Sequence, residues 1–296
     1  MIDFSCKHNV WIQNDDGTKS RMDEPYFRSK RIAEGTWQIL SSGDYSYLLV
    51  GEEHALAIDS GYGAGNIREY MEELCGKPVP WIANTHDHFD HTANNSYFDL
   101  AFMSEATKPL ATIPFPSFEG IDFPRDYPVQ TLNDGDVIPL KGREIRAFLL
   151  PDHAVGSLVF LDRKQRILFS GDEFIGTQKN LRAGMRSWTE HLRNLSAYRD
   201  QFDRICGGSG CYDGSLFDHY LACMEFALTH DGEPYRDARP WDNQKPEMKE
   251  PIVYNRMEPH PEDRYHPEEV AQEPQDIRRI EHEGITVIFN ADLKRE

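Results

Sequence analysis

The densest chemical signal in the chain is a run of three histidines and two aspartates within six residues, His86-Asp87-His88-Phe89-Asp90-His91. Imidazole nitrogens and carboxylate oxygens are the donors that Zn²⁺ and similar divalent ions prefer. His86 and His88 can converge on one ion in an extended or looped backbone, while Asp90 and His91 point toward a second ion. A chance cluster is the alternative, but only 12 of 296 residues are histidine. The pattern therefore indicates a metal site with room for two ions.

Two later segments each place a metal-ligand residue in a turn just after a predicted strand. His153 lies in the segment LLPDHAVGS, and Asp172 lies in LFSGDEF. Taken alone, His153 has an ordinary explanation as a structural histidine, and Asp172 has one as a turn residue beside Gly171. Their order after the histidine cluster favours a shared site.

The elements that must position these residues alternate between strands and helices. Short β-rich runs predict strands over 36–40, 45–50 and 54–59. Apolar residues at helical spacing predict a helix over 65–75, and VPWIANT predicts a strand over 79–85 that leads directly into the histidine cluster. Later elements are predicted as strands over 144–151, 157–162 and 166–172 and as helices over about 187–204 and 214–230. This order indicates a layered α/β domain.

Three further regions surround or interrupt this pattern. Residues 1–31 are polar and are interpreted as an N-terminal arm, and 32–230 form the main domain. Residues 231–296 are a proline-rich C-terminal extension whose aromatic residues and final strand over 284–291 predict an ordered segment. We expect it to pack on its own domain or to form a homo-oligomer. The loop 109–130 has five prolines, which suggests a lid or a pocket wall. Its aromatic residues are Phe115, Phe118, Phe123 and Tyr127.

Charge and composition argue against two classes of partner. Lys and Arg total 32 against 50 Asp and Glu, and the net charge of -18 repels nucleic-acid phosphates and anionic membranes. The chain starts without a secretory pattern, and no apolar run is long enough to span a membrane. We therefore expect a cytoplasmic protein that acts on a small molecule. Five scattered cysteines, an odd number, predict reduced thiols.

Together, these motifs resemble the metallo-β-lactamase superfamily. The matching segments are IDSGYG at 58–63, H-x-H-x-D-H at 86–91, H-x-x-G-S at 153–157 and Gly-Asp at 171–172. The resemblance extends over about 32–230. It implies an α/β fold of the four-layer αββα sandwich type, with the C-terminal extension added to it. In that fold the metals lie at the edge where two sheets meet.

The resemblance also implies a role for each matching residue. The implied metal ligands are His86, His88 and His153 for the first ion, Asp90 and His91 for the second, and Asp172 for both. Asp59 would be a structural carboxylate that supports the metal loops. The implied cofactor is Zn²⁺, as one or two ions, with Fe or Mn as alternatives. Asp90 is also the expected catalytic residue, because a carboxylate near the second ion can accept a proton and return it to the leaving group.

One segment departs from the family pattern. The family usually supplies a last histidine to the second metal from a P-G-H-G-like turn, and the corresponding segment here is CGGSGC at 206–211. Ser209 stands at the expected histidine position. A serine hydroxyl is a poorer ligand than imidazole, so the second site is expected to be weak, empty or completed by another donor. The candidate donors are Cys211 as a thiolate, His219, His260 and His266.

The expected activity is hydrolysis, since a bound divalent ion lowers the pKa of water toward ~7 and provides a metal-bound hydroxide. The acidic surface argues against the nuclease branches of the superfamily. Glyoxalase-II-like thioesterases and lactonases remain, so the expected substrate is a small ester, lactone, thioester or amide. Two alternatives stay open. One is a mononuclear iron oxidoreductase of the persulfide dioxygenase kind, and the other is a non-catalytic metal- or ligand-binding protein.

Overall fold

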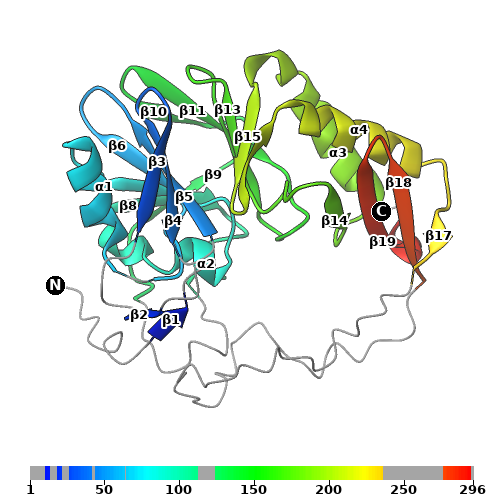
Figure 1. The fold of residues 1–296 in the computed structure, drawn as a ribbon, viewed down its shortest axis with the longest axis horizontal. Helices are drawn as coiled ribbons and strands as arrows, with labels where there is room; N and C mark the ends of the chain where they lie inside the picture. The colour runs from blue at the N-terminus through cyan, green and yellow to red at the C-terminus, as the bar shows by residue number, and fades with distance from the viewer. Residues whose placement is uncertain are drawn as a thin grey trace.

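Two β-sheets stacked face to face form the centre of the computed structural model (Figure 1). The described residues are 27–41, 44–63, 65–112, 124–235 and 276–294, with the backbone of 11–13 and 19–21. Helix α1 (Ile67–Cys75) covers the outer face of the first sheet. Helices α3 (Met185–Ser196) and α4 (Ser215–Ala227) cover the outer face of the second.

The first sheet has seven strands in the order β3-β4-β5-β6-β7-β8-β9. Their bounds are β3 (Arg28–Ala33), β4 (Thr36–Ser41), β5 (Asp44–Val50), β6 (Ala55–Ile58), β7 (Trp81–Ala83), β8 (Leu100–Ser104) and β9 (Val129–Leu132). Strands β3 to β6 pair antiparallel, whereas β6 to β9 run parallel. The predicted strands before the histidine cluster are thus confirmed.

The second sheet has six strands in the order β10-β11-β12-β13-β15-β16. Their bounds are β10 (Val137–Leu140), β11 (Arg143–Leu149), β12 (Leu158–Asp162), β13 (Ile167–Gly171), β15 (Arg204–Gly207) and β16 (Gly210–Asp213). Strand β13 is parallel to β15, and β15 and β16 form an antiparallel hairpin. The helix predicted over about 187–204 ends earlier, because a short 3₁₀ turn at Arg199–Gln201 and then β15 follow it.

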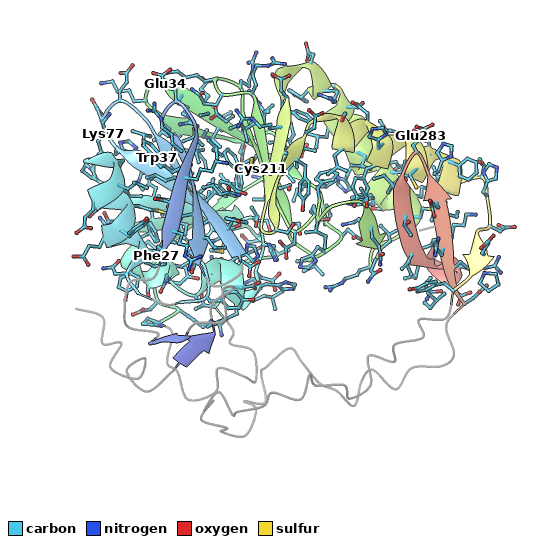
Figure 2. The ribbon with its side chains drawn as sticks, viewed as in Figure 1. Phe27, Glu34, Trp37, Lys77, Cys211 and Glu283 are labelled. Carbon is cyan, nitrogen blue, oxygen red and sulfur yellow. A yellow bond between two sulfur atoms is a disulfide. The ribbon has the colours of Figure 1, made fainter. Side chains whose placement is uncertain are left out.

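Alternating side chains along the central strands build three separate apolar cores. In β12, Leu158 and Phe160 face the core between the sheets, while Val159 and Leu161 face α3 and α4. A third core, containing Met71 of α1, lies on the other side of the first sheet. Figure 2 shows the side chains that fill these layers. Three cores between four layers form the αββα sandwich, so the predicted fold is confirmed.

The C-terminal segment adds a small sheet in the order β14-β19-β18-β17 beside α4 (Figure 1). Its bounds are β14 (Gln178–Asn180), β17 (Glu233–Pro234), β18 (Ile277–His282) and β19 (Ile285–Asn290), followed by a 3₁₀ turn at Ala291–Leu293. Strand β19 confirms the predicted final strand. Its Val287 and Phe289 join the core of α3 and α4, so this end of the chain packs on the main domain.

Several predicted regions lie partly outside the described residues. The N-terminal arm contains a pair of short strands, β1 (Trp11–Gln13) and β2 (Lys19–Arg21), and it ends in β3. Phe115, Phe118 and Phe123 lie outside the described residues, so the pocket-wall role of their loop stays a prediction. No helix among the described residues is long and apolar enough to cross a membrane.

Candidate metal centre

The loops that follow the strands bring all six predicted ligands together at one edge of the sandwich. The cluster at 86–91 follows β7, and its second half forms a short helix, α2 (Phe89–Thr92). His153 lies between β11 and β12, and Asp172 directly follows β13. The parallel strands β6 and β7 end at the same edge, which also places Asp59 there.

His86, His88 and His153 form the first ligand group. One ligand atom from each lies within 4.8 Å of the others. His153 Nε2 and His88 Nδ1 are 2.9 Å apart, which directs both nitrogens to one point. His86 Nε2 is buried and has no hydrogen-bond partner among the described residues. Three convergent imidazole nitrogens are suited to a Zn²⁺-like ion.

Asp172 lies between this group and a second one. Its Oδ2 is 3.6 Å from His153 Nε2, and its Oδ1 is 3.7 Å from His91 Nε2. Each carboxylate oxygen therefore faces a different histidine. This is the arrangement that a carboxylate shared by two ions requires.

The second group contains Asp90, His91 and a residue that the sequence reasoning missed, Asp44. One ligand atom from each lies within 4.8 Å of the others. Asp44 is the first residue of β5 and directly precedes the predicted strand over 45–50. Because β5 pairs antiparallel with β6, its start lies beside the end of β6 and thus at the site edge. Only the strand pairing reveals this position.

Burial and neighbouring charges shift the pKa values of the site. Burial lowers the pKa of His86 well below its usual range and that of His153 to about 3, so both imidazoles are neutral. Burial alone would also lower the pKa of His91, but the carboxylates around it raise it well above its usual range. Burial and Asp90 raise the pKa of Asp44 to about 7. The second group thus concentrates negative charge around one buried imidazole.

Asp59 has the supporting role that the resemblance implied. Its Oδ1 accepts the backbone N–H of Thr85 at 2.8 Å, and its Oδ2 accepts the Thr85 hydroxyl at 2.7 Å. The same Oδ2 lies 2.9 Å from His91 Nδ1. This contact leaves His91 Nε2, which is buried and without a hydrogen-bond partner among the described residues, available to hold an ion.

Asp59→Asn should weaken metal binding at the second group by roughly 10- to 100-fold. An amide nitrogen facing His91 Nδ1 would favour the tautomer that carries its proton on Nε2, the ligand atom. Competition with a chromogenic chelator measures the affinity. Asp203→Asn is the matched control, because Asp203 is exposed just before β15, at the opposite end of the parallel pair β13–β15 from Asp172. Equal affinities in both variants would contradict the role of Asp59.

A buried ion-pair cluster holds the loop of His153, and the sequence reasoning missed it. Lys179 Nζ lies 2.8 Å from Asp152 Oδ2 and 2.9 Å from Glu173 Oε2. Glu173 Oε1 accepts the backbone N–H of His153 at 2.8 Å. Asp152 Oδ1 accepts two backbone N–H groups at 182–183, just before α3. Charged residues are usually exposed, so their sequence alone does not indicate this burial.

The hairpin β15–β16 carries the segment where the family's last histidine was expected. Ser209 is exposed and its hydroxyl hydrogen-bonds the Tyr212 hydroxyl at 2.8 Å, so the prediction that Ser209 faces the second site is wrong. Gly208 faces it instead, since a Cβ there would lie 2.3 Å from Asp172 Oδ1 and 3.1 Å from His91 Cε1. The hairpin therefore offers the second group no side-chain ligand.

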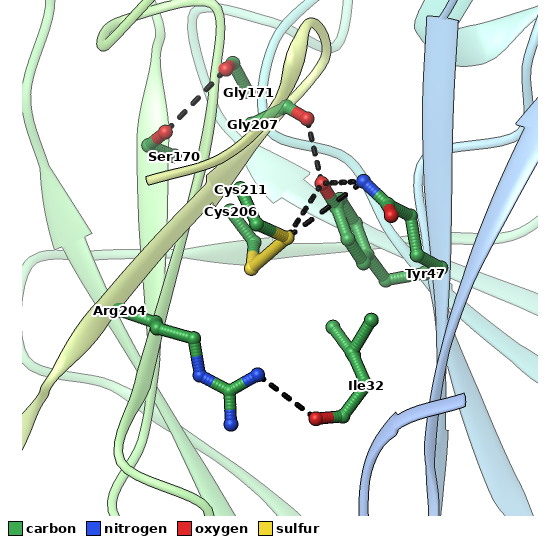
Figure 3. The surroundings of a disulfide bond; sticks show 9 residues. Ile32, Tyr47, Ser170, Gly171, Arg204, Cys206, Gly207 and Cys211 are labelled. Atoms are coloured by element: carbon green, nitrogen blue, oxygen red, sulfur yellow. Dashed lines mark hydrogen bonds between the residues drawn. A yellow bond between two sulfur atoms is a disulfide. The ribbon is translucent and has the colours of Figure 1, made fainter. Parts of the chain in front are cut away.

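Cys206 and Cys211 form a disulfide across this hairpin, with their Cα atoms 4.1 Å apart (Figure 3). The expectation of reduced thiols is wrong for this pair, because the strand register places the two residues opposite each other. Cys211 as a thiolate ligand is therefore also wrong. The other two cysteines of the described ranges are free thiols. The Tyr47 hydroxyl donates to the Gly207 carbonyl at 2.7 Å, which links the hairpin to the first sheet.

Sequence comparison finds relatives that cover part of this chain. Residues 43–205, more than half of the chain, match the family profile of the metallo-beta-lactamase superfamily. The human acyl-coenzyme A thioesterase MBLAC2 is 28% identical over 185 residues, covering 50% of this chain and 66% of that protein. An Aspergillus fumigatus atrochrysone carboxyl ACP thioesterase is 24% identical over 167 residues, covering 54% of this chain and 49% of that protein. The chain thus spans less than two thirds of these relatives.

Solved structures share the fold at low identity. A metallo-beta-lactamase from Pontibacter korlensis superposes with a TM-score of 0.53 at 18% identity, covering 68% of this chain and 99% of that one. A variant of the sec-alkyl sulfatase PisA1 reaches 0.56 at 10% identity, covering 74% and 49%. Since the family match contains the histidine cluster, His153 and Asp172 within a four-layer sandwich, the chain belongs to the metallo-beta-lactamase superfamily.

Proposed function

We propose that this protein is a metal-dependent hydrolase that cleaves the thioester bond of a small acyl substrate. The observation that carries the proposal is the pair of adjoining ligand groups, which meet at Asp172. The human and fungal relatives are both named as thioesterases, which favours a thioester among the substrates that the sequence left open.

The donor set fits divalent ions. His86 Nε2 and His91 Nε2 lack hydrogen-bond partners among the described residues. Leaving such a buried group unpaired costs about 1–3 kcal/mol, which ion binding would offset. The proposed ligands are His86, His88 and His153 for the first ion, Asp90 and His91 for the second, and Asp172 for both. When bound, such ions polarise the attacked carbonyl and lower the pKa of water toward ~7. Zn²⁺ suits the first group best.

Asp90 is the proposed proton carrier. Its Oδ2 lies 3.7 Å from His91 Nε2, while its Oδ1 is buried without a hydrogen-bond partner in the described part of the chain. A carboxylate with one uncommitted oxygen can accept a proton from the attacking water as the C–O bond forms. The same oxygen can return this proton to the sulfur as the C–S bond breaks.

Two exposed apolar side chains adjoin the ligand loops and suit an acyl group. Val155 lies two residues after His153 and is 59% exposed. Ile175 lies three residues after Asp172 and is 42% exposed. Apolar side chains beside polar catalytic groups are typical of sites for small organic ligands. We propose that both contact the acyl chain, together with the loop at 109–130.

The test compares matched acyl-thioester and acyl-ester substrates of several chain lengths on the full chain supplied with Zn²⁺ or Mn²⁺. We expect thiol release that stops when a chelator removes the ion and returns when the ion is added back. Failure to hydrolyse any thioester would contradict the proposal. Oxygen uptake with a ferrous ion would instead support the dioxygenase alternative. Ligand binding that is unchanged by the chelator, without turnover, would support the binding-protein alternative.

A further inference from the structure

We propose that Asp44 is a ligand of the second ion and takes the place of the histidine that the β15–β16 hairpin lacks. This inference rests on the metal centre of the proposed function and extends it to a residue outside the family motif. The second site would then consist of the carboxylates of Asp44, Asp90 and Asp172 with the imidazole of His91. The first site would keep three imidazoles and the shared Asp172.

The position of Asp44 supports this assignment. In the antiparallel pairing of β5 and β6, Tyr47 lies opposite Ile58, the last residue of β6. Asp44 precedes Tyr47 by three residues and therefore lies past the end of β6, at the site edge. There it forms a group with Asp90 and His91 whose ligand atoms lie within 4.8 Å of one another. The Tyr62 hydroxyl donates a hydrogen bond to its carboxylate, which helps to orient it.

A buried nitrogen points to a cation inside this group. The side chain of His91 is only 1% exposed, and its Nε2 has no hydrogen-bond partner among the described residues. The carboxylates of Asp44, Asp90 and Asp172 gather around His91 and repel one another. A divalent ion would bind His91 Nε2 and neutralise this repulsion.

The other candidate donors that lie in the described ranges do not reach the second group. Gly208 has no side chain, and the Ser209 hydroxyl is hydrogen-bonded to the Tyr212 hydroxyl. Cys211 forms the disulfide with Cys206. His219 is exposed on α4. His260 and His266 lie outside the described residues. Within those ranges, Asp44 is the donor that the fold brings to Asp90 and His91.

The changed donor set predicts a changed metal preference. Carboxylate oxygens are hard donors that suit Mn²⁺, whereas imidazole-rich sites suit Zn²⁺. Replacing one imidazole by a carboxylate therefore shifts the second site toward Mn²⁺. The first site should keep its preference for Zn²⁺.

The experiment titrates the full chain, stripped of metal and then loaded with one equivalent of Zn²⁺, with Mn²⁺. Bound and free Mn²⁺ are separated by electron paramagnetic resonance. We expect one Mn²⁺ per chain in the parent protein. Asp44→Asn, which keeps the shape of the side chain, should weaken this Mn²⁺ binding by roughly 100-fold or more while the Zn²⁺ stays bound. Asp203→Asn should bind Mn²⁺ like the parent.

Unchanged Mn²⁺ affinity in Asp44→Asn would overturn the proposal, and so would a parent protein that binds no second ion of either metal. Thermal unfolding provides an independent readout: Mn²⁺ should raise the unfolding temperature of the parent but not that of Asp44→Asn. Asp44→Ala repeats the test if the Asn variant does not fold. Two bound ions without thioester hydrolysis would refute the proposed function and leave the role of Asp44 intact.

Discussion

His86→Ala should reduce thioester hydrolysis by about 10³-fold or more and remove the tightly bound ion of the first group. His86 is buried at the centre of the cluster, and its ring lies 4.1 Å from that of His91 and 4.9 Å from that of His153. Losing one of three imidazole ligands removes several kcal/mol of transition-state stabilisation, and each 1.4 kcal/mol is about tenfold in rate. Metal content and kcat/KM measure the two effects.

His219→Ala is the matched control, since His219 is an exposed histidine on α4 away from the ligands. It should keep both metal content and activity. Urea unfolding of both variants separates a loss of metal from a loss of fold. Full metal and full activity in folded His86→Ala would refute the assignment of the first group.

Lys179→Met should destabilise the protein by about 3–5 kcal/mol, because it leaves two buried carboxylates without their cation. The side chains of Lys179, Asp152 and Glu173 are 4%, 0% and 1% exposed. Methionine keeps the length and apolar stem of lysine, so the loss reports mainly on charge. The loop of His153 should loosen as well, since Glu173 accepts its backbone N–H. Urea unfolding measures the stability, and metal affinity measures the effect on the loop.

The control here is Lys141→Met, which removes an exposed lysine paired with Glu53. Exposed ion pairs are screened by water, so this change should leave the urea concentration at the unfolding midpoint unchanged. A Lys179→Met protein as stable as its control would show that Asp152 and Glu173 are not ionised together in the folded state.

The sequence was sufficient where the determining interactions are local. The cluster at 86–91 contains five residues with donor side chains, three histidines and two aspartates. Its capacity to bind a metal can therefore be predicted before any fold is known. Strands β6, β12 and β13 are runs of mostly apolar residues, and the two faces of each strand pack in different cores. The order of strands and helices was therefore sufficient to predict a layered α/β domain, while the sandwich and the edge that carries the site were implied by the family resemblance of the motifs.

Side-chain direction in the β15–β16 hairpin was not predictable in this way. A shift of one residue along a strand turns a side chain to the opposite face. The sequence pattern placed Ser209 at the site, whereas the register turns Ser209 toward Tyr212 and Gly208 toward Asp172. The same register places Cys206 opposite Cys211, a pairing that spacing alone does not establish.

Asp44 and Lys179 required the tertiary structure for a related reason. Asp44 precedes the histidine cluster by more than forty residues, and only the pairing of β5 with β6 brings it beside Asp90 and His91. In the sequence, Lys179 cannot be distinguished from a surface lysine. In the structure it lies in β14 and is buried between the carboxylates of Asp152 and Glu173. The sequence by itself determined which local groups can bind a metal and which strands lead into them, because residue type and short spacing are local properties. The tertiary structure decided which distant charges complete and support the site, because strand register and burial depend on pairings between segments far apart in the chain.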